Sequence, residues 1–176
     1  MIRRIKALFV WISRMHHSLG FGVQSPTDYA FIRTVVNEHM DYYQYESLGK
    51  NDDWLTRKLG RLYFRLANWR QPRVIESDAY REYFSAGCQT ADFGVSNELV
   101  RLSLNDDIRP VLSRVYDNVD DKTVLVVEGI YNDKYARQIW KEIVEDERSK
   151  ITFDLYYCGI VMFENSRYKC GYKVNF

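Results

Sequence analysis

A turn rich in polar side chains stands where an α/β protein would hold a cofactor. The stretch QPRVIESDAYREYFSAG, residues 71–87, reads as a buried strand followed by a helix over 79–84. Such turns hold nucleotide cofactors with the help of glycines, because the backbone must bend sharply and present bare N–H groups to the ligand. Here the turn is Glu76-Ser77-Asp78 and has no glycine. A cofactor site has therefore been lost, has moved elsewhere in the protein, or was never present.

A second candidate residue follows the most apolar segment of the chain. Residues 123–127, TVLVV, form a continuous apolar run typical of a central parallel strand, and Glu128 and Gly129 come directly after it. A carboxylate at the carboxyl end of such a strand lies in the crevice where α/β sheets bind ligands, so Glu128 is the best single candidate for a site. Because the sequence identifies no partner for it, a solvated acid that caps the next helix is the favoured alternative.

Metal binding and nucleophilic catalysis find little support. His16 and His17 are adjacent, so on a helix their side chains point about 100° apart and cannot share a metal, while His39 lies far along the chain. Cys88 has no histidine near it in sequence that could activate it, and a buried thiol is predicted. We therefore predict no metal site, and no catalytic residue is identified.

Composition narrows the class of protein. The chain has 176 residues, 46% of them hydrophobic, which suits one compact domain with an extension. Its 25 basic and 24 acidic residues are mixed along the chain and give a net charge of +1, which argues against nucleic-acid binding. The three cysteines form no CxxC pair, so neither a disulfide framework nor a zinc site is indicated and a reducing cytoplasm fits best.

The N-terminal stretch MIRRIKALFVWISRMHH carries Arg3, Arg4 and Lys6 ahead of an apolar run at residues 7–12. That run is too short for a signal peptide and far below the ~20 apolar residues of a membrane span. We predict an amphipathic helix, whose apolar residues at helical spacing are Ile2, Ile5, Phe9 and Ile12. A helix packed on the domain is favoured over an anchor on a membrane surface.

The next segments also predict helices. Ser25-Pro26-Thr27-Asp28 combines a capping serine, a proline at the first helical position and an acid three residues after the cap, which is a strong helix start. The residues expected to share one face of that helix are Tyr29, Ile32, Val36 and Met40. A third helix is expected over 53–67, so residues 1–70 are predicted to form a helical extension ahead of the sheet.

From residue 71 onward strands and helices alternate, which predicts a mostly parallel sheet covered by helices. The expected strands are 73–76, 91–95, 100–104, 123–127, 151–157, 160–164 and an edge strand within 168–176, with helices over 108–119 and 134–147. The fold class predicted for residues 71–176 is therefore α/β, a three-layer sandwich with helices on the faces of the sheet.

Four stretches together resemble a known family: HHSLGFGVQSPTDYAFI, DYYQYESL, KLGRLYFRLANWRQPRVIE and TVLVVEGIYNDKYARQIWKEI…KITFDLYYCGIVMFE. In them the chain is similar to a group of Bacteroidetes proteins described as class I S-adenosylmethionine-dependent methyltransferases. The resemblance covers about residues 14–76 and 122–164 and fails between them. It implies a Rossmann-like methyltransferase domain with an N-terminal helical extension.

The family's methyl-donor site lies mainly between the first and fourth strands, where a glycine-rich turn receives the cofactor and an acid ending the second strand binds its ribose. The equivalent residues here would be Glu76, Ser77, Asp78 and Asp92, and Glu128 would be what remains of an acidic pair that relatives carry. This departure from the family's glycine turn predicts that the donor site is eroded.

The chain also looks shortened relative to the family. About 100 residues follow Pro72, which stands just before the first strand. A seven-strand core with its helices uses roughly twice that number at ordinary element and loop lengths. We therefore expect at least one strand–helix pair of the middle sheet to be missing.

Three functions remain open from the sequence. The favoured one is a degenerate, inactive methyltransferase-like protein without bound S-adenosylmethionine, which serves as a binding or assembly module for a protein partner or a small molecule. The second is an active small methyltransferase that binds the donor through rearranged loops. The third is an interaction protein whose basic N-terminal helix binds a partner or a membrane surface. An exposed sheet edge at 172–176 would also permit a homodimer by strand addition.

Overall fold

The structure, a computed structural model, describes the backbone of residues 2–176 and the side chains of residues 8–18 and 20–176. Every regular element before the first strand is helical. These elements are α1 (Ile2–Ser13), the 3₁₀ turn η1 (Met15–Gly20), α2 (Pro26–Phe31), the π-helical turn η2 (Ile32–Val36), the 3₁₀ turn η3 (Tyr43–Glu46) and α3 (Trp54–Arg70). The helices expected ahead of the sheet are thus present.

A seven-stranded sheet follows, in the order β2-β1-β3-β4-β6-β5-β7. Its strands are β1 (Val74–Glu76), β2 (Asp92–Phe93), β3 (Leu99–Ser103), β4 (Val124–Glu128), β5 (Ile151–Asp154), β6 (Cys158–Met162) and β7 (Cys170–Lys173). Three helices alternate with them: α4 (Arg81–Gly87), α5 (Arg109–Asp117) and α6 (Lys134–Glu145). All neighbouring pairs are parallel except those of β6 with β4 and with β5. The predicted α/β class with a mostly parallel sheet is confirmed.

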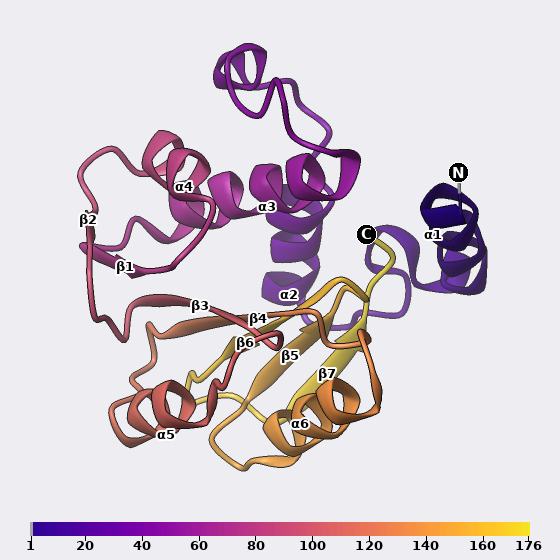
Figure 1. The fold of residues 1–176 in the computed structure, drawn as a ribbon. Coiled ribbons are helices and arrows are strands. Elements are labelled where there is room, and N and C mark those ends of the chain that lie inside the picture. Colours follow the sequence, from indigo (N-terminus) through magenta and orange to yellow (C-terminus); the bar gives the residue numbers. More distant parts are fainter. Residues whose placement is uncertain (1) are drawn as a thin grey trace.

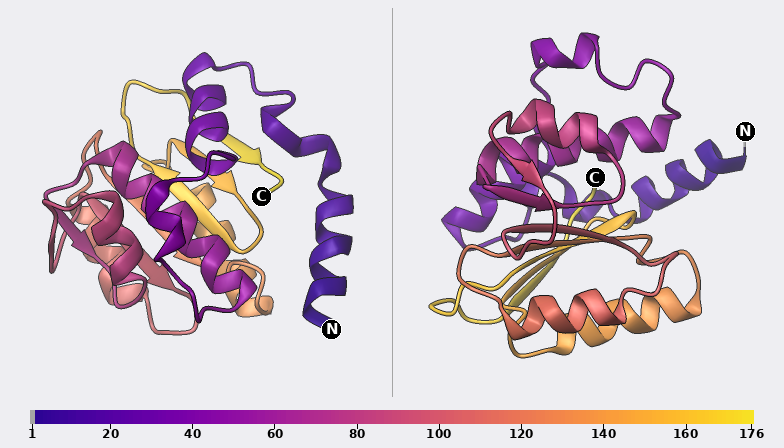
Figure 2. Two further views of the ribbon diagram at one scale, coloured as in Figure 1. Left: turned by 90° about the horizontal axis from the view of Figure 1, so that it is seen from above. Right: turned by 60° about the vertical axis from the view of Figure 1, so that its left-hand side comes forward.

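Helices cover both faces of the sheet (Figures 1 and 2). Helices α2 and α3 lie over one face, and α5 and α6 over the other. The continuous apolar sequence of β4 explains why it is central: Val124 and Val126 belong to the core under α2 and α3, whereas Leu125 and Val127 belong to the core under α5 and α6. Successive side chains of a strand point to opposite faces, so a strand buried on both sides must be apolar throughout.

Strands β2 and β3 are joined by a short link, residues 94–98, that contains no helix. The two strands lie on either side of β1 and run parallel to it. Parallel crossovers normally need a dozen residues or more. This link can be shorter because β2 has only two residues, so the chain has little length to retrace.

Local sequence signals fix the starts of α2 and α3. The Ser25 hydroxyl accepts the backbone N–H of Asp28 at 3.3 Å, and the Asp53 carboxylate accepts that of Thr56 at 2.8 Å. Both are the side-chain caps that leave fewer helical N–H groups unpaired. The expected continuation of the second helix to Met40 is wrong, because the helical path ends at Val36 and Met40 is 69% exposed.

The expected packing of α1 on the domain is wrong for residues 8–12. Leu8, Phe9, Trp11 and Ile12 are 50–67% exposed, and α1 projects away from the sheet and its covering helices (Figure 2). Among the described residues, the Asn175 side chain donates to the backbone carbonyl of Trp11 at 3.4 Å. Just after the helix, Arg14 donates to the backbone carbonyl and to the carboxylate of Asp154, each at 2.9 Å.

A close contact between α6 and the sheet depends on a glycine in β6. A Cβ atom at Gly159 would lie 2.2 Å from the Trp140 ring, a separation that packed side chains do not tolerate. Trp140 is 6% exposed and lies in the core under α6, so it has little room to move.

We predict that Gly159→Ala lowers the free energy of unfolding by about 2 kcal/mol, because the added methyl group overpacks this contact. Gly94→Ala is the matched control, since its nearest neighbour, Val74, would lie 4.0 Å from the new Cβ atom. The control should change stability by less than about 0.5 kcal/mol. Urea denaturation followed by circular dichroism measures both, and equal stabilities would contradict the packing argument.

Candidate functional site

Five side chains meet at the carboxyl ends of β1, β3 and β4: Tyr63, Asp78, Tyr80, Arg101 and Glu128, which we call the Arg101 cluster. Arg101 lies on β3, and its Nε and Nη2 atoms donate to Oε2 of Glu128 at 3.1 and 2.6 Å. Its Nη1 atom forms an ion pair with Asp78, in the loop after β1. One guanidinium group therefore bridges that loop and the end of β4.

Two tyrosine hydroxyl groups also donate hydrogen bonds to Glu128. The Tyr63 hydroxyl, from α3, donates to Oε2 at 3.0 Å, and the Tyr80 hydroxyl donates to Oε1 at 3.3 Å. Tyr80 stands just before α4 with a φ of 58°, a conformation unusual for a bulky residue. It places the Tyr80 ring 4.8 Å from the ring of Tyr63 and 5.3 Å from the guanidinium carbon of Arg101.

Electrostatics keep the phenols and the neighbouring thiol protonated. Burial, and secondly the charge of nearby Glu128, raises the pKa of Tyr80 and of the Cys158 thiol above their ordinary values. Burial is also the main cause that raises the pKa of Tyr63. At neutral pH these groups act as neutral hydrogen-bond donors or buried thiols, and not as a general base or a thiolate nucleophile.

The three residues of the glycine-free turn are all engaged within the protein. Glu76 accepts the backbone N–H of Ser96 at 2.8 Å and forms an ion pair with Arg114 of α5. The Ser77 hydroxyl donates to the carbonyl of Ala79 at 2.6 Å. Asp78 is the most exposed of the three and pairs with Arg101.

The other two predicted residues have different surroundings. Asp92 opens β2 instead of ending it and lies opposite Val74, the first residue of β1, so it is not at the edge of the sheet that carries Glu128. Glu128 is not the solvated helix cap that was favoured, because it accepts hydrogen bonds from three other members of the Arg101 cluster. Asp133 caps α6 instead, by accepting the N–H of Ala136 at 2.7 Å.

Sequence reasoning missed Arg101, Tyr63 and Tyr80. A signal for Arg101 was present, because the alternation in VRLSL puts Arg101 and Ser103 on the opposite face of the strand from Val100 and Leu102. A cation inside a predicted central strand needs a carboxylate partner, and Glu128 on the adjacent strand was available.

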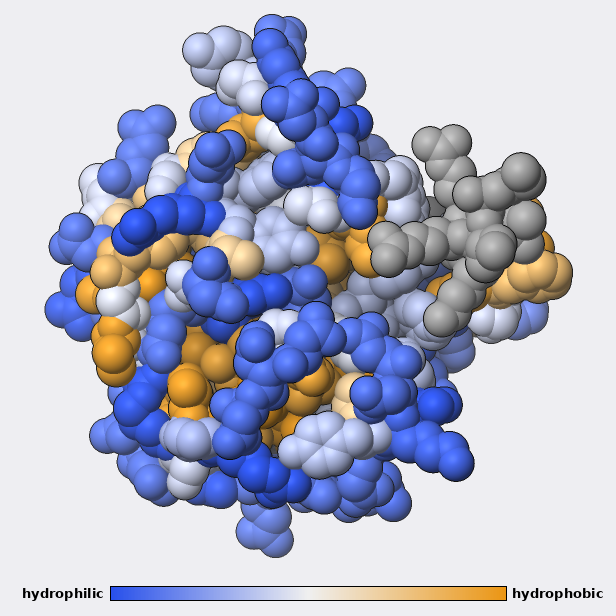
Figure 3. All heavy atoms as spheres, viewed as in Figure 1, coloured by the Kyte–Doolittle hydropathy of each residue, from blue (hydrophilic) through white to orange (hydrophobic). Residues whose placement is uncertain are grey.

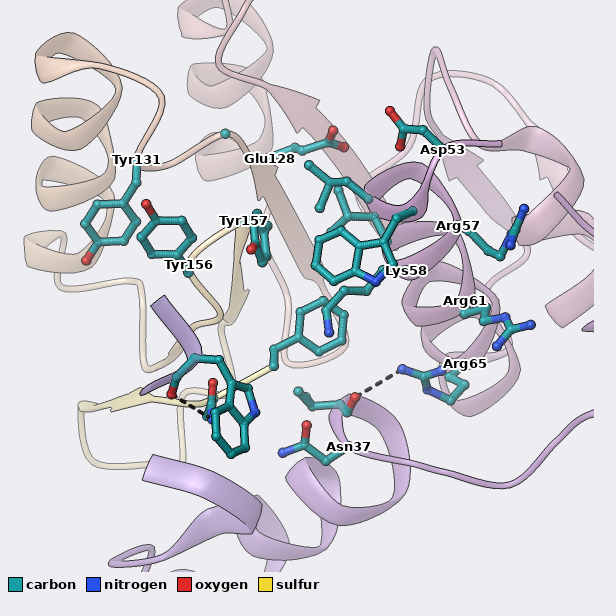
Figure 4. Close-up of a pocket in the computed structure, with 18 of the residues that line it drawn as sticks. Asn37, Asp53, Arg57, Lys58, Arg61, Arg65, Glu128, Tyr131, Tyr156 and Tyr157 are labelled. Carbon is teal, nitrogen blue, oxygen red and sulfur yellow. Dashed lines mark hydrogen bonds between the residues drawn. The ribbon is translucent and has the colours of Figure 1, made fainter. Parts of the chain in front are cut away.

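A cleft of about 1460 Å³ opens beside the Arg101 cluster, with Glu128 on its wall (Figure 4). It lies between α3, residues 36–39, the loop that follows β4 and the turn between β5 and β6. In Figure 4, Lys58 reaches from α3 toward the middle of the cleft, with Tyr157 on one side and Asn37 below.

Helix α3 brings four cations to the wall of this cleft: Arg57, Lys58, Arg61 and Arg65. Arg57 donates to backbone carbonyl groups of the loop at 49–52, and Arg65 to those of residues 35 and 36. Among the side chains that the structure describes, none of the four forms an ion pair with a carboxylate. Their charges are therefore not neutralised locally.

Lys58 is the cation with the least polar surroundings. Its Nζ atom lies 4.3 Å from the ring centre of Phe176 and 5.4 Å from that of Trp54. Burial, and secondly the charge of Arg65, lowers the pKa of Lys58 to about 8. The ammonium group is thus charged at neutral pH but held in a site that favours its loss of a proton.

The remaining candidates give no further site within the described part of the chain. No group of three His, Cys, Asp or Glu side chains there is arranged to hold a metal ion. His16, His17 and His39 are exposed, and Cys88 is the buried thiol that was predicted. Among the described helices, none has the length and apolar character needed to cross a membrane.

We predict that Arg101→Met lowers the free energy of unfolding by about 3 kcal/mol, because Glu128 is left with an uncompensated charge in a largely buried site. The double variant Arg101→Met, Glu128→Met should regain most of that loss. Arg73→Met, which breaks an exposed pair with Glu98, is the surface control and should cost less than about 1 kcal/mol. Urea denaturation tests this, and equal losses for Arg101→Met and Arg73→Met would contradict it.

Comparison of the chain with family models, with curated proteins and with solved structures finds no match in any of the three. The assignment of function therefore depends on the geometry of the Arg101 cluster and of the cleft beside it.

Proposed function

We propose that the chain is a methyltransferase-like domain that does not bind the methyl donor and serves as a binding module through its cleft. The observation that carries this proposal is the Arg101 cluster. Its side chains occupy the carboxyl ends of β1, β3 and β4, the crevice in which open α/β sheets take their ligands.

Topology supports the methyltransferase-like part of the proposal. The hairpin of β5 and β6 adds to β4 after helix α6, which is the arrangement implied by the resemblance for the fifth strand and the last strand pair. The helix-free link at 94–98 falls where the resemblance fails, and it accounts for a middle section shorter than in relatives.

The state of the turn after β1 supports the absence of a donor. In the family a glycine-rich turn at this place lets the cofactor approach bare backbone. Here Asp78 and Tyr80 come from that loop and contact Arg101, while Glu76 is held by Arg114. A donor molecule would have to displace ion pairs and hydrogen bonds of a largely buried group, which is costly.

We expect no change in the thermal unfolding midpoint at millimolar S-adenosylmethionine or its demethylated product. A ligand at 100 times its dissociation constant would add about 2.7 kcal/mol and raise the midpoint by several degrees. A shift that is lost in Asp78→Ala but kept in Asp92→Ala, each compared with its own ligand-free midpoint, would overturn the proposal in favour of an active methyltransferase.

A second function is favoured by the exposed face of α1. Leu8, Phe9, Trp11 and Ile12 are at least half exposed on this helix, and Figure 3 shows apolar surface where α1 projects. The same stretch of sequence is basic, since the first acidic residue of the chain is Asp28. Apolar aromatic residues combined with basic ones are typical of helices that bind an anionic membrane surface.

We predict that the full chain sediments with vesicles that contain phosphatidylserine and not with vesicles of phosphatidylcholine alone. Phe9→Glu should abolish this binding, because a charge would have to enter the apolar interface. Tyr168→Glu is the matched control, since Tyr168 is 94% exposed and lies near the opposite end of the chain. Equal sedimentation of the two variants, or none for the unaltered chain, would exclude this second function.

We also propose a reducing cytoplasmic setting and homodimerisation by strand addition. A reducing cytoplasmic setting is supported by the unpaired state of Cys88, Cys158 and Cys170. Homodimerisation by strand addition is supported by β7, which pairs only with β5 among the described strands. The exposed edge expected at 172–176 is wrong beyond Lys173, because Val174 and Asn175 are buried and the Asn175 N–H donates to the carbonyl of His17 at 3.0 Å.

A further inference from the structure

We propose that the cleft beside Lys58 binds an organic anion, in which an oxyanion group is joined to an apolar body about the size of one or two aromatic rings. This inference rests on the proposed role as a binding module and adds the chemical class of the ligand. It is carried by unused hydrogen-bond donors, by an excess of positive charge and by exposed aromatic rings, all of which line the same cleft.

Two hydrogen-bond donors on the cleft wall, Asn37 and Lys58, have no acceptor among the described residues. The amide nitrogen of Asn37 is buried and has no hydrogen-bond partner, and it is the one such side-chain atom among the described residues. Lys58 Nζ lies against two aromatic rings, and no hydrogen bond or ion pair to it is found among the described side chains. Buried polar groups are nearly always paired in folded proteins, so the Asn37 amide indicates a ligand with acceptor oxygens, and the Lys58 ammonium group is available to the same ligand.

Charge on the cleft wall also favours an anion. Of the four acids there, Glu128 is balanced by its ion pair with Arg101. Asp52 accepts the Tyr83 hydroxyl at 2.7 Å, Asp53 caps α3, and Glu38 accepts the backbone N–H of Met40 at 2.9 Å. The four cations of α3 outnumber these three acids, so the cleft attracts anions in preference to cations.

The four cations differ in what they can reach. Arg57 and Arg61 extend away from the middle of the cleft in Figure 4, and the Arg65 guanidinium is held by carbonyl groups. Lys58 is the one that extends toward the middle. An oxyanion would therefore contact Lys58 directly, while the arginines contribute through the local potential.

Aromatic rings beside Lys58 could contact the apolar part of the ligand. Trp54 is 48% exposed on the cleft wall, and its ring lies edge-on to Tyr157 with 6.0 Å between centres. The Phe176 ring also lies against Lys58, with its centre 4.3 Å from Nζ. Exposed rings beside a cation form a surface that suits a flat apolar group joined to an anion.

The charged state of Lys58 makes the proposal sensitive to pH. Its free pKa of about 8 reflects burial and the charge of Arg65, with Cys158 of β6 a smaller, opposite influence. The other titratable groups that line the cleft are Glu38, His39, Asp52, Asp53, Arg57, Arg61, Arg65, Glu128, Tyr131, Tyr156 and Tyr157. Only the charged ammonium group attracts an oxyanion, so affinity should be full below pH 8 and fall as pH rises above it.

The test is isothermal titration of the full chain with 2-naphthoate and with 2-naphthamide, its uncharged counterpart of the same shape, at pH 6.5 and low salt. We expect the naphthoate to bind at least about tenfold more tightly. Lys58→Gln should weaken naphthoate binding by about tenfold, and Lys141→Gln, which alters an exposed lysine of α6 paired with Glu145, should leave it unchanged. Between pH 6.5 and pH 9 the affinity of the unaltered chain should fall about tenfold, and that of Lys58→Gln should stay constant.

Equal affinities for naphthoate and naphthamide, or equal affinities of Lys58→Gln and Lys141→Gln, would overturn the inference, and so would no binding at all. If the naphthyl group bound to the exposed face of α1 instead, Lys58→Gln and Lys141→Gln would have equal affinities, because Lys58 would have no influence on that binding. A parallel titration with S-adenosylmethionine separates the two proposals. Failure of naphthoate alone removes this ligand class, whereas binding of S-adenosylmethionine removes the binding-module role itself.

Discussion

The placement of an arginine inside a central strand is the constraint on which the rest of the site depends. Arg101 has a side chain only 5% exposed, and a cation taken out of water is costly unless nearby acceptors surround it. Glu128 on the adjacent strand provides the main acceptor, and Asp78 provides a second. Because the Tyr63 and Tyr80 hydroxyl groups also donate to Glu128, one charge ties together β3, β4, α3 and the loop after β1.

The same constraint determines the character of the neighbouring cleft. Glu128 faces the cleft, but its charge is balanced by Arg101 and screened by two phenols. The charge of this acid is thereby balanced, and the four cations of α3 outnumber the three remaining acids of the wall, Glu38, Asp52 and Asp53. Lys58 can remain unpaired there because its apolar neighbours, and not a carboxylate, fix its position.

Sequence periodicity was sufficient for the elements and insufficient for the site. The seven strands and the helices between them follow from alternation and from apolar runs, which are local properties of the chain. The position of Glu128 at the end of β4 follows from the same reasoning. Its partners do not, because Tyr63 and Arg101 reach it through packing across many residues of sequence. For α1, amphipathicity indicated an apolar face but contained no information about what covers it.

Shortening of the middle of the chain and filling of the crevice have a common physical origin under the proposed function. The link at 94–98 follows a strand β2 of two residues, in which Asp92 comes first and Phe93, not an acid, stands at the carboxyl end. Without a ligand to accommodate, side chains of the loop after β1 are free to close over the strands, and Arg101 supplies the charge that holds them. Glu128 in turn is required by Arg101, because a buried arginine needs a carboxylate partner.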